Sequence, residues 1–214
     1  SRLEDIRIAY RADDRTALKS ICLDLMTDHA STRERIPCLE HFYERIFQIT
    51  GIPRRILDVA SGVHPLAIPW MGLDCDAVYH AYEIARDMVD GLNGFLEAIG
   101  MMPLVHFQDV ICVPPEQEGD LAFLMKMVPC LERRQKGIAL QLIHSLRVRY
   151  VVVTFPVQSL SGRSKNMPEH YTKTFTESLQ GTQWKLAHVP MEGELVFVVD
   201  KNPTSEKHQQ NCHP

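Results

Sequence analysis

The chain has 214 residues, of which 45% are hydrophobic and 23% charged, a balance that fits one globular domain and excludes a disordered, collagen-like or coiled-coil protein. No apolar run approaches the roughly 20 residues of a membrane span, we expect no secretory signal, and six cysteines without a CxxC pair favour reduced thiols over a disulfide framework or zinc site. The formal net charge of -4, taken alone, argues against a nucleic-acid ligand.

The first 50 residues are predicted to be helical. Apolar side chains recur about every 3.6 residues over 17–30 and again over 37–50, which is the period of an amphipathic helix. Pro37 is tolerable in a first helical turn, and Gly51-Ile52-Pro53 ends the second helix. We therefore expect a short N-terminal helical segment over residues 1–50.

After Pro53, short apolar strands alternate with helices. The strands are predicted over 54–60, 77–84, 104–110, 120–126 and 149–156. One helix follows the second strand and ends at about residue 99, a second follows the fourth strand and ends at about residue 146, and a third runs from about 168 to 179. The last two strands, 185–191 and 194–200, are predicted to form a hairpin around Glu192-Gly193. Such an alternation implies a parallel, doubly wound sheet with an antiparallel last strand.

This order of elements looks like the class I S-adenosylmethionine (SAM) methyltransferase fold, an α/β architecture with a Rossmann-like seven-stranded sheet. We expect a SAM-binding methyltransferase domain over residues 51–200, behind the N-terminal helical segment. The polar tail over 201–214 is predicted to be disordered.

Candidate ligand-binding residues follow the predicted strands, because a sheet of this kind binds its ligand beyond the carboxyl ends of the strands. The first strand ends in Asp58 and a turn of small residues that includes Ala60 and Gly62. Its single glycine argues against a GxGxxG dinucleotide site. Asp58 can meet an ammonium group, as in the methionyl part of SAM, and a turn with an incidental aspartate is the alternative.

The next two strands also end in acidic residues. Glu83 lies 25 residues after Asp58, where a carboxylate can accept both ribose hydroxyls; the alternative is a glutamate that interacts with a helix dipole. Asp109 can accept from an adenine amino group, and the Val110 N–H can donate to the ring. Three acidic strand ends in register favour a SAM site.

The fourth strand ends at Met125 and Lys126, the position that faces the methyl group in methyltransferases. The Asn-Pro-Pro-Tyr-like motif of amino-group methyltransferases is absent. A lysine can bind a phosphate or a base edge, and so suits a ring nitrogen with its own lone pair. The alternative is a structural lysine whose stem packs on the strand end.

The charge is distributed unevenly along the chain. Residues 1–125 carry 11 Lys and Arg against 20 Asp and Glu, whereas residues 126–173 carry nine Lys and Arg against two Glu. A local basic face attracts a polyanion more than the net charge repels it, so the middle block favours a nucleic-acid partner over a merely solvated surface.

Several segments together resemble the aminoglycoside-resistance 16S rRNA (guanine-N7) methyltransferases. The specific ones are HASTRER (29–35) and FP with SLSGRSKNM (155–167), and the supporting ones are ILDVASG with PLA (56–67), QDV with PP (108–115) and GDLA with Lys126 and LE (119–132). The resemblance covers about residues 28–200. It implies methyl transfer from SAM, leaving S-adenosyl-L-homocysteine (SAH), to a guanine N7 in 16S rRNA of the 30S subunit.

The resemblance also implies roles for particular residues. Arg33 would lie near the SAM carboxylate, Asp58 near the amino group, Glu83 on the ribose and Asp109 near the adenine. The full cofactor-binding set is Arg33, Asp58, Ala60, Gly62, Glu83, Asp109, Val110 and Met125. Lys126 and Asp109 are the expected catalytic residues, and Lys126, Arg163 and Lys165 are expected to face RNA or the target base.

The sequence also departs from that family. Only 28 residues precede His29, where the family carries a longer basic helical extension for docking on the small subunit, so we expect the chain to lack that extension. We expect a cytoplasmic monomer with no membrane or metal partner, since the ten histidines form no HxH or HxxxH pair. The alternatives are a methyltransferase for another RNA or a small metabolite, and a non-enzymatic SAM-fold protein that binds RNA.

Overall fold

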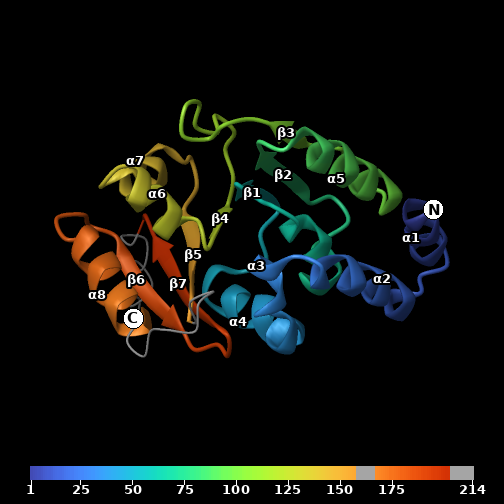
Figure 1. Ribbon diagram of the computed structural model, residues 1–214, viewed down its shortest axis with the longest axis horizontal. Coiled ribbons are helices and arrows are strands. Elements are labelled where there is room, and N and C mark those ends of the chain that lie inside the picture. Colours follow the sequence, from blue (N-terminus) through green and yellow to red (C-terminus); the bar gives the residue numbers. More distant parts are fainter. Residues whose placement is uncertain (158–166, 203–214) are drawn as a thin grey trace, which may run out of the picture.

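The computed structural model describes residues 1–157 and 167–202, apart from the side chains of residues 30 and 31. Its centre is a seven-stranded sheet in the order β3-β2-β1-β4-β5-β7-β6 (Figure 1). The first five strands are parallel, and β7 runs antiparallel to both β5 and β6. The predicted class I methyltransferase fold, with its closing hairpin, is therefore confirmed.

The strands coincide with the predicted ones to within a few residues. They are β1 (Arg55–Val59), β2 (Val78–Glu83), β3 (Val105–Phe107), β4 (Leu121–Met125), β5 (Tyr150–Pro156), β6 (Lys185–Val189) and β7 (Glu194–Asp200). The third is shorter than predicted because the chain turns after Phe107, where the Asp109 carboxylate accepts a hydrogen bond from the Ile111 N–H at 2.9 Å.

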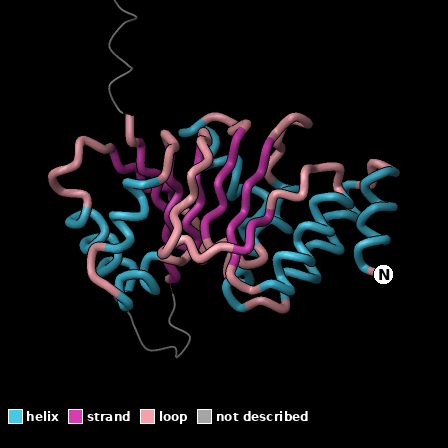
Figure 2. Tube along the Cα trace, turned by 90° about the horizontal axis from the view of Figure 1, so that it is seen from above, coloured by secondary structure: helices cyan, strands magenta, loops and turns pink. Residues whose placement is uncertain are grey.

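The helices form two layers, one on each face of the sheet (Figure 2). The N-terminal ones are α1 (Arg2–Arg11), α2 (Arg15–Thr27), α3 (Ala30–Arg33), the 3-10 helix η1 (Ile36–Cys38) and α4 (Leu39–Thr50). With the 3-10 helix η2 (His64–Trp70) and α5 (Arg86–Ala98), they cover the face that carries Ile56 and Tyr79. The other face, which carries Leu57 and Val59, is covered by α6 (Val128–Arg134), α7 (Ile138–Ser145) and α8 (Met167–Ser178).

Helix α4 shows why the first 50 residues fold onto the sheet. Its buried side chains are Leu39, Phe42, Tyr43, Ile46 and Phe47, the spacing that places one apolar stripe along a helix. The stripe packs in the same core cluster as sheet residues of β1, β2 and β4. The N-terminal segment is therefore continuous with the core of the sheet.

The single helix predicted between the fourth and fifth strands is wrong, because the structure has two. Gly137 has a left-handed backbone with φ 80°, which a helix interior does not accept. The Glu132 carboxylate accepts hydrogen bonds from the Gly137 and Ala139 N–H groups at 2.9 and 3.1 Å, and so satisfies the first turn of α7. The 3-10 helix over His64–Trp70 was not predicted, because its two prolines lie in a short apolar segment without a clear period.

The hairpin between β6 and β7 contacts the N-terminal segment closely. Arg45 donates a hydrogen bond to the Pro190 carbonyl at 2.7 Å. Gly193 has φ 79°, and a Cβ atom there would collide with the carbonyl oxygen of Glu34. The backbone of the turn thus lies directly against the segment that joins α3 to α4.

Two histidines meet on β2 and β3, at the opposite edge of the sheet from the β6–β7 hairpin. His80 of β2 and His106 of β3 face each other through ring nitrogens 3.0 Å apart, with their planes at 16°. A hydrogen bond of this kind needs one protonated and one unprotonated nitrogen. Burial lowers the pKa of both imidazoles, and His106 lowers that of His80 further.

We expect Gly193→Ala to destabilise the protein by about 2 kcal/mol or more, since it adds a collision to the cost of roughly 1–2 kcal/mol for a left-handed alanine. Gly181→Ala is the matched control, because Gly181 also has a left-handed backbone with φ 89° but has open space around it. Urea denaturation measures both. Equal losses in the two variants would contradict the proposed contact with Glu34.

The histidine pair should make the protein sensitive to mild acid. A lowered pKa in the folded state means that stability is present above the unfolded value of about 6.5 and is lost as the pH falls below it. Urea midpoints of the wild type should therefore decrease between pH 7.5 and pH 5 more than those of the His80→Gln, His106→Gln double variant. Parallel pH profiles would disprove this prediction.

Candidate functional site

The candidate site lies at the carboxyl ends of β1, β2, β3 and β4. These strands are neighbours in the sheet, and the chain order reverses between β1 and β4, which is where sheets of this type bind ligands. The turn after β1 holds two left-handed residues, Ala60 and Gly62, each with φ 52°. The Ser61 N–H donates to the Tyr82 carbonyl at 2.9 Å, so the turn is fastened to the end of β2.

Glu83, the last residue of β2, organises two loops at this edge. One carboxylate oxygen accepts a hydrogen bond from the Gly62 N–H at 2.9 Å. The other accepts from the Ile84 and Ala85 N–H groups at 2.8 and 3.0 Å. The predicted ribose-binding carboxylate is therefore brought directly beside the predicted small-residue turn.

The residues predicted near the adenine follow β3. The backbone N–H of Ile111 lowers the pKa of the Asp109 carboxyl, and the Cys112 thiol adds to this effect. The Val110 side chain is buried in the core, so only its backbone can contribute to a binding surface. Met125 is the last residue of β4 and is half-buried.

The sequence interpretation did not identify Ile84. Its apolar side chain is 66% exposed although it directly follows Glu83. Phe107, at the end of β3, is 53% exposed and lies 4.3 Å from the Arg86 guanidinium. Exposed apolar side chains beside a polar strand end are typical of a surface that stacks against a flat ligand.

Asp58 differs from the other strand-end acids because its side chain is fully buried. One carboxylate oxygen accepts hydrogen bonds from the Tyr79 hydroxyl at 2.8 Å and from the His64 Nδ1 at 3.0 Å. The other oxygen is buried and has no hydrogen-bond partner among the described residues. The sequence analysis linked neither His64 nor Tyr79 to Asp58, and only the fold shows that they converge on it.

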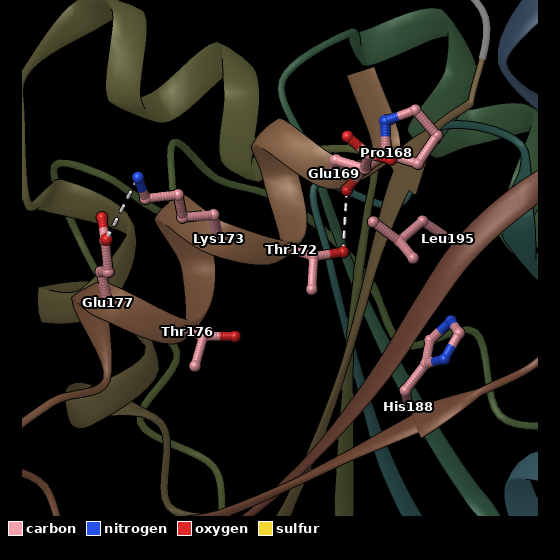
Figure 3. Close-up of a pocket in the computed structure, with 8 residues that line it drawn as sticks. All are labelled: Pro168, Glu169, Thr172, Lys173, Thr176, Glu177, His188 and Leu195. Carbon is pink, nitrogen blue, oxygen red and sulfur yellow. Dashed lines mark hydrogen bonds and ion pairs between the residues drawn. The ribbon is translucent and has the colours of Figure 1, made fainter. Parts of the chain in front are cut away.

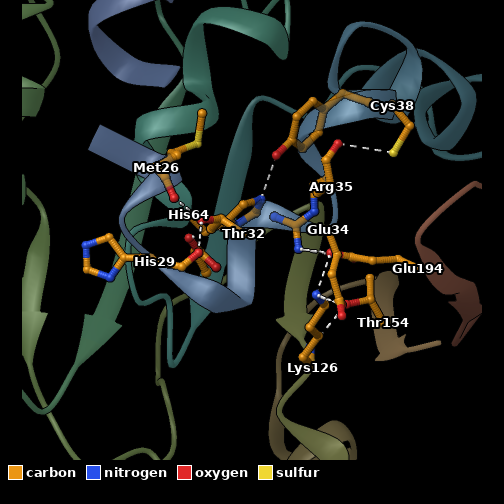
Figure 4. Close-up of polar contacts among 12 residues, drawn as sticks. Met26, His29, Thr32, Glu34, Arg35, Cys38, His64, Lys126, Thr154 and Glu194 are labelled. Atoms are coloured by element: carbon orange, nitrogen blue, oxygen red, sulfur yellow. Dashed lines mark hydrogen bonds and ion pairs between the residues drawn. The ribbon is translucent and has the colours of Figure 1, made fainter. Parts of the chain in front are cut away.

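Lys126 lies in a chain of charges that joins three parts of the fold (Figure 4). Its ammonium group lies 2.6 Å from the Glu34 carboxylate and 3.2 Å from that of Glu194. Glu194 in turn pairs with Arg35 at 2.9 Å. The structure therefore places Lys126 at the predicted strand end, but its charge is neutralised by carboxylates that the sequence interpretation did not single out.

The Arg35–Glu194 end of this chain of charges is buried. The Arg35 and Glu194 side chains are 4% and 0% exposed, and Arg35 also lies 4.9 Å from the centre of the Phe42 ring. Burial by itself lowers the pKa of Arg35, but the adjacent Glu194 carboxylate raises it above its ordinary value. The backbone of Lys126 is left-handed, with φ 56°, and its N–H donates to the Thr154 carbonyl and hydroxyl at 3.1 Å.

Of the remaining predicted residues, only Arg33 lies within the described ranges. Arg33 ends α3 and is exposed, with its Nε 3.3 Å from the Thr27 carbonyl. Arg163 and Lys165 fall outside the described residues. Three other cations, Arg133, Arg134 and Lys136, are exposed where α6 meets α7. Within residues 1–157 and 167–202, none of these three forms an ion pair.

A cavity of about 600 Å³ lies between α8 and the β6–β7 hairpin (Figure 3). Thr172, Thr176, His188 and Leu195 line it together with other residues of α8. None of its lining residues belongs to the ends of β1 to β4, so this cavity is separate from the candidate site. In the part of the chain that the structure describes, no cluster of three or more His, Cys, Asp or Glu could hold a metal ion, and no helix is long and apolar enough to cross a membrane.

Comparison with solved structures finds the same fold in 16S rRNA methyltransferases. The 16S rRNA methyltransferase RmtF, in complex with S-adenosyl-L-homocysteine, has a TM-score of 0.76 and 30% sequence identity, and the match covers 93% of this chain and 75% of that one. The 16S rRNA methylase RmtB has a TM-score of 0.71 and 31% identity, with 94% of this chain and 74% of that chain covered.

Sequence comparison gives the same result. The 16S rRNA (guanine(1405)-N(7))-methyltransferase of Micromonospora rosea is 33% identical over 199 residues, which are 93% of this chain and 73% of that protein. The enzyme of the same description from Serratia marcescens is 36% identical over 175 residues, or 81% of this chain and 68% of that protein. Residues 1–198 match the model of the ribosomal RNA methyltransferase (FmrO) family, and the chain belongs to that family.

Proposed function

We propose that the chain transfers a methyl group from SAM to N7 of guanine 1405 in 16S rRNA. The observation that carries this function is the family match over residues 1–198, together with relatives described by that reaction. The carboxyl edge of the sheet supports it independently, because acidic side chains lie at or just beyond the ends of β1, β2 and β3, next to a tight turn.

The residues at this edge fit the chemical groups of SAM. The unpartnered oxygen of buried Asp58 is an acceptor that an ammonium group can satisfy. The turn over Ala60 and Gly62 presents small side chains, so a ligand can approach its backbone. Glu83 retains lone pairs for ribose hydroxyls beyond those that hold the two loops. When bound, SAM supplies an electrophilic methyl group on a sulfonium sulfur.

The chemistry of guanine N7 matches what the site offers. N7 carries a free lone pair, so no general base has to remove a proton before methyl transfer. The protein then contributes mainly by holding the base in line with the methyl group, which can supply about 7–11 kcal/mol of the barrier reduction. A base in paired RNA must first leave its stack, so the site must also bind the extruded nucleotide.

We propose that Lys126 acts closest to the reaction and that Asp109 holds the adenine end of the cofactor. The Glu34 side chain is 29% exposed, so incoming RNA can replace its contact with Lys126 while buried Glu194 stays in place. Asp109 is held as an acceptor by the Ile111 N–H, which suits the adenine amino group. Arg33, Ala60, Gly62, Val110 and Met125 complete the proposed cofactor site.

The RNA itself is proposed to lie along the basic middle of the chain. Arg133, Arg134 and Lys136 present positive charge between α6 and α7, and Arg163 and Lys165 are the further proposed contacts. Phosphate contacts of this kind release counterions and make binding depend on salt. We propose that the monomeric protein acts on the 30S subunit, and therefore in the cytoplasm, where that subunit is found.

Isolated 30S subunits incubated with the protein and methyl-labelled SAM should become labelled on a single guanine of 16S rRNA. Borohydride and aniline cleavage, followed by primer extension, should place N7-methylguanine at position 1405, because those reagents break the chain at that modified base. Naked 16S rRNA is the matched substrate control. Label on small molecules, and none on subunits or rRNA, would refute the proposed function.

Glu83→Ala should weaken SAH binding by about tenfold or more, since hydrogen bonds to a charged group contribute roughly 1.5–3 kcal/mol. Glu97→Ala, an exposed change on α5, is the control. Isothermal titration calorimetry gives both affinities, and thermal unfolding checks that each variant folds. An unchanged affinity in Glu83→Ala would remove Glu83 from the cofactor site.

A further inference from the structure

A line of hydrogen bonds runs from helix α4 to the buried strand-end aspartate. The Tyr43 hydroxyl lies 2.9 Å from His64 Nε2, His64 Nδ1 lies 3.0 Å from an Asp58 oxygen, and the Tyr79 hydroxyl donates to the same oxygen at 2.8 Å. All four side chains are 2% exposed or less. The line crosses from the N-terminal segment through η2 to β1 and β2.

The direction of each hydrogen bond follows from the groups involved. Burial raises the pKa of both Tyr43 and Tyr79, so both hydroxyls keep their protons. A carboxylate oxygen accepts, so the proton between His64 and Asp58 belongs to Nδ1. The Tyr43 hydroxyl, which keeps its proton, is hydrogen-bonded to Nε2 of the same ring.

Packing holds the imidazole in this orientation. The Phe123 ring meets the His64 ring edge-on, at 4.9 Å between centres and 83° between planes. The centre of the Tyr43 ring lies 5.9 Å from that of the His64 ring, with 27° between the planes. His64 therefore has little freedom to turn its Nδ1–H away from Asp58.

The consequence is an asymmetric carboxylate. One oxygen of Asp58 receives two donors, whereas the other is buried and has no partner among the described residues. A buried acceptor without a donor is unfavourable, and a ligand that donates to it removes that penalty. The hydrogen-bonded line thus determines which Asp58 oxygen can accept from a ligand, and it fixes the position of that oxygen.

We propose that Tyr43 and His64 are positioning residues that hold Asp58 for the ammonium group of SAM. This inference rests on the proposed function for the identity of the ligand. Neither residue touches the ligand; each acts through the Asp58 carboxylate. Helix α4 is thereby part of the cofactor site, although it follows no strand end.

Two ligands separate this role from mere packing. SAH carries the amino-acid group, and 5′-methylthioadenosine has the same adenine, ribose and thioether without it. A positioning role through Asp58 affects only the ligand with the ammonium group. A general collapse of the turn after β1 affects both ligands alike.

The experiment is calorimetric titration of both ligands into four variants. Tyr43→Phe and His64→Leu should each weaken SAH about threefold to tenfold, as expected for one hydrogen bond, and leave methylthioadenosine within about twofold of the wild type. His64→Asn, whose amide can still donate to Asp58, should regain most of the SAH affinity. Tyr82→Phe is the matched control, because it also removes a buried hydroxyl, one that bonds Gln117 instead.

The outcomes are decisive in either direction. Selective loss of SAH affinity, with recovery in His64→Asn, supports the positioning role. Equal losses of affinity for both ligands, or no loss for either, would overturn it. It would also be overturned if the wild type bound SAH no more tightly than methylthioadenosine, because the amino-acid group would then contribute nothing to binding. Because no step requires RNA, failure to methylate 30S subunits would refute the proposed function and leave this result standing.

Discussion

The buried ion pair between Arg35 and Glu194 is the interaction on which the rest of this structure depends. Both side chains are almost completely removed from water, so neither charge is tolerable without the other. Removing one partner of such a pair typically costs about 3–5 kcal/mol. The pair fixes the segment between α3 and α4 against the start of β7, and Gly193 allows the two backbones to meet there.

Through this contact the N-terminal helices become part of the site. Glu194 also pairs with Lys126 at the end of β4, and the segment that supplies Arg35 supplies Glu34 to the same ammonium group. Helix α4 begins three residues after the 3-10 turn opens and brings Tyr43 to His64. Side chains of the first 50 residues thus contact and orient Lys126 and His64, which follow β4 and β1.

Local sequence patterns predicted the helices and strands well, but they did not predict which side chains from distant segments pair with each other. Alternating apolar residues located all seven strands, and the acidic strand ends were recognisable because a parallel sheet brings successive strand ends to one edge. The burial of Glu194 was not predictable from its neighbours, since its partner Arg35 is 159 positions away. Likewise, nothing in the segment around His64 distinguishes it from a surface histidine until β1, β2 and α4 are placed together. Gly137 was the one local signal that could have divided the predicted helix over 127–146.

The separation of 159 positions between Arg35 and Glu194 has a consequence for biosynthesis. At roughly 5–20 residues per second, the ribosome adds Glu194 about 8–30 s after Arg35. Until then the arginine has no carboxylate to accompany it into the interior, and the apolar stripe of α4 has no completed sheet to cover. The N-terminal helices can therefore form this buried ion pair only after the start of β7 has been synthesised.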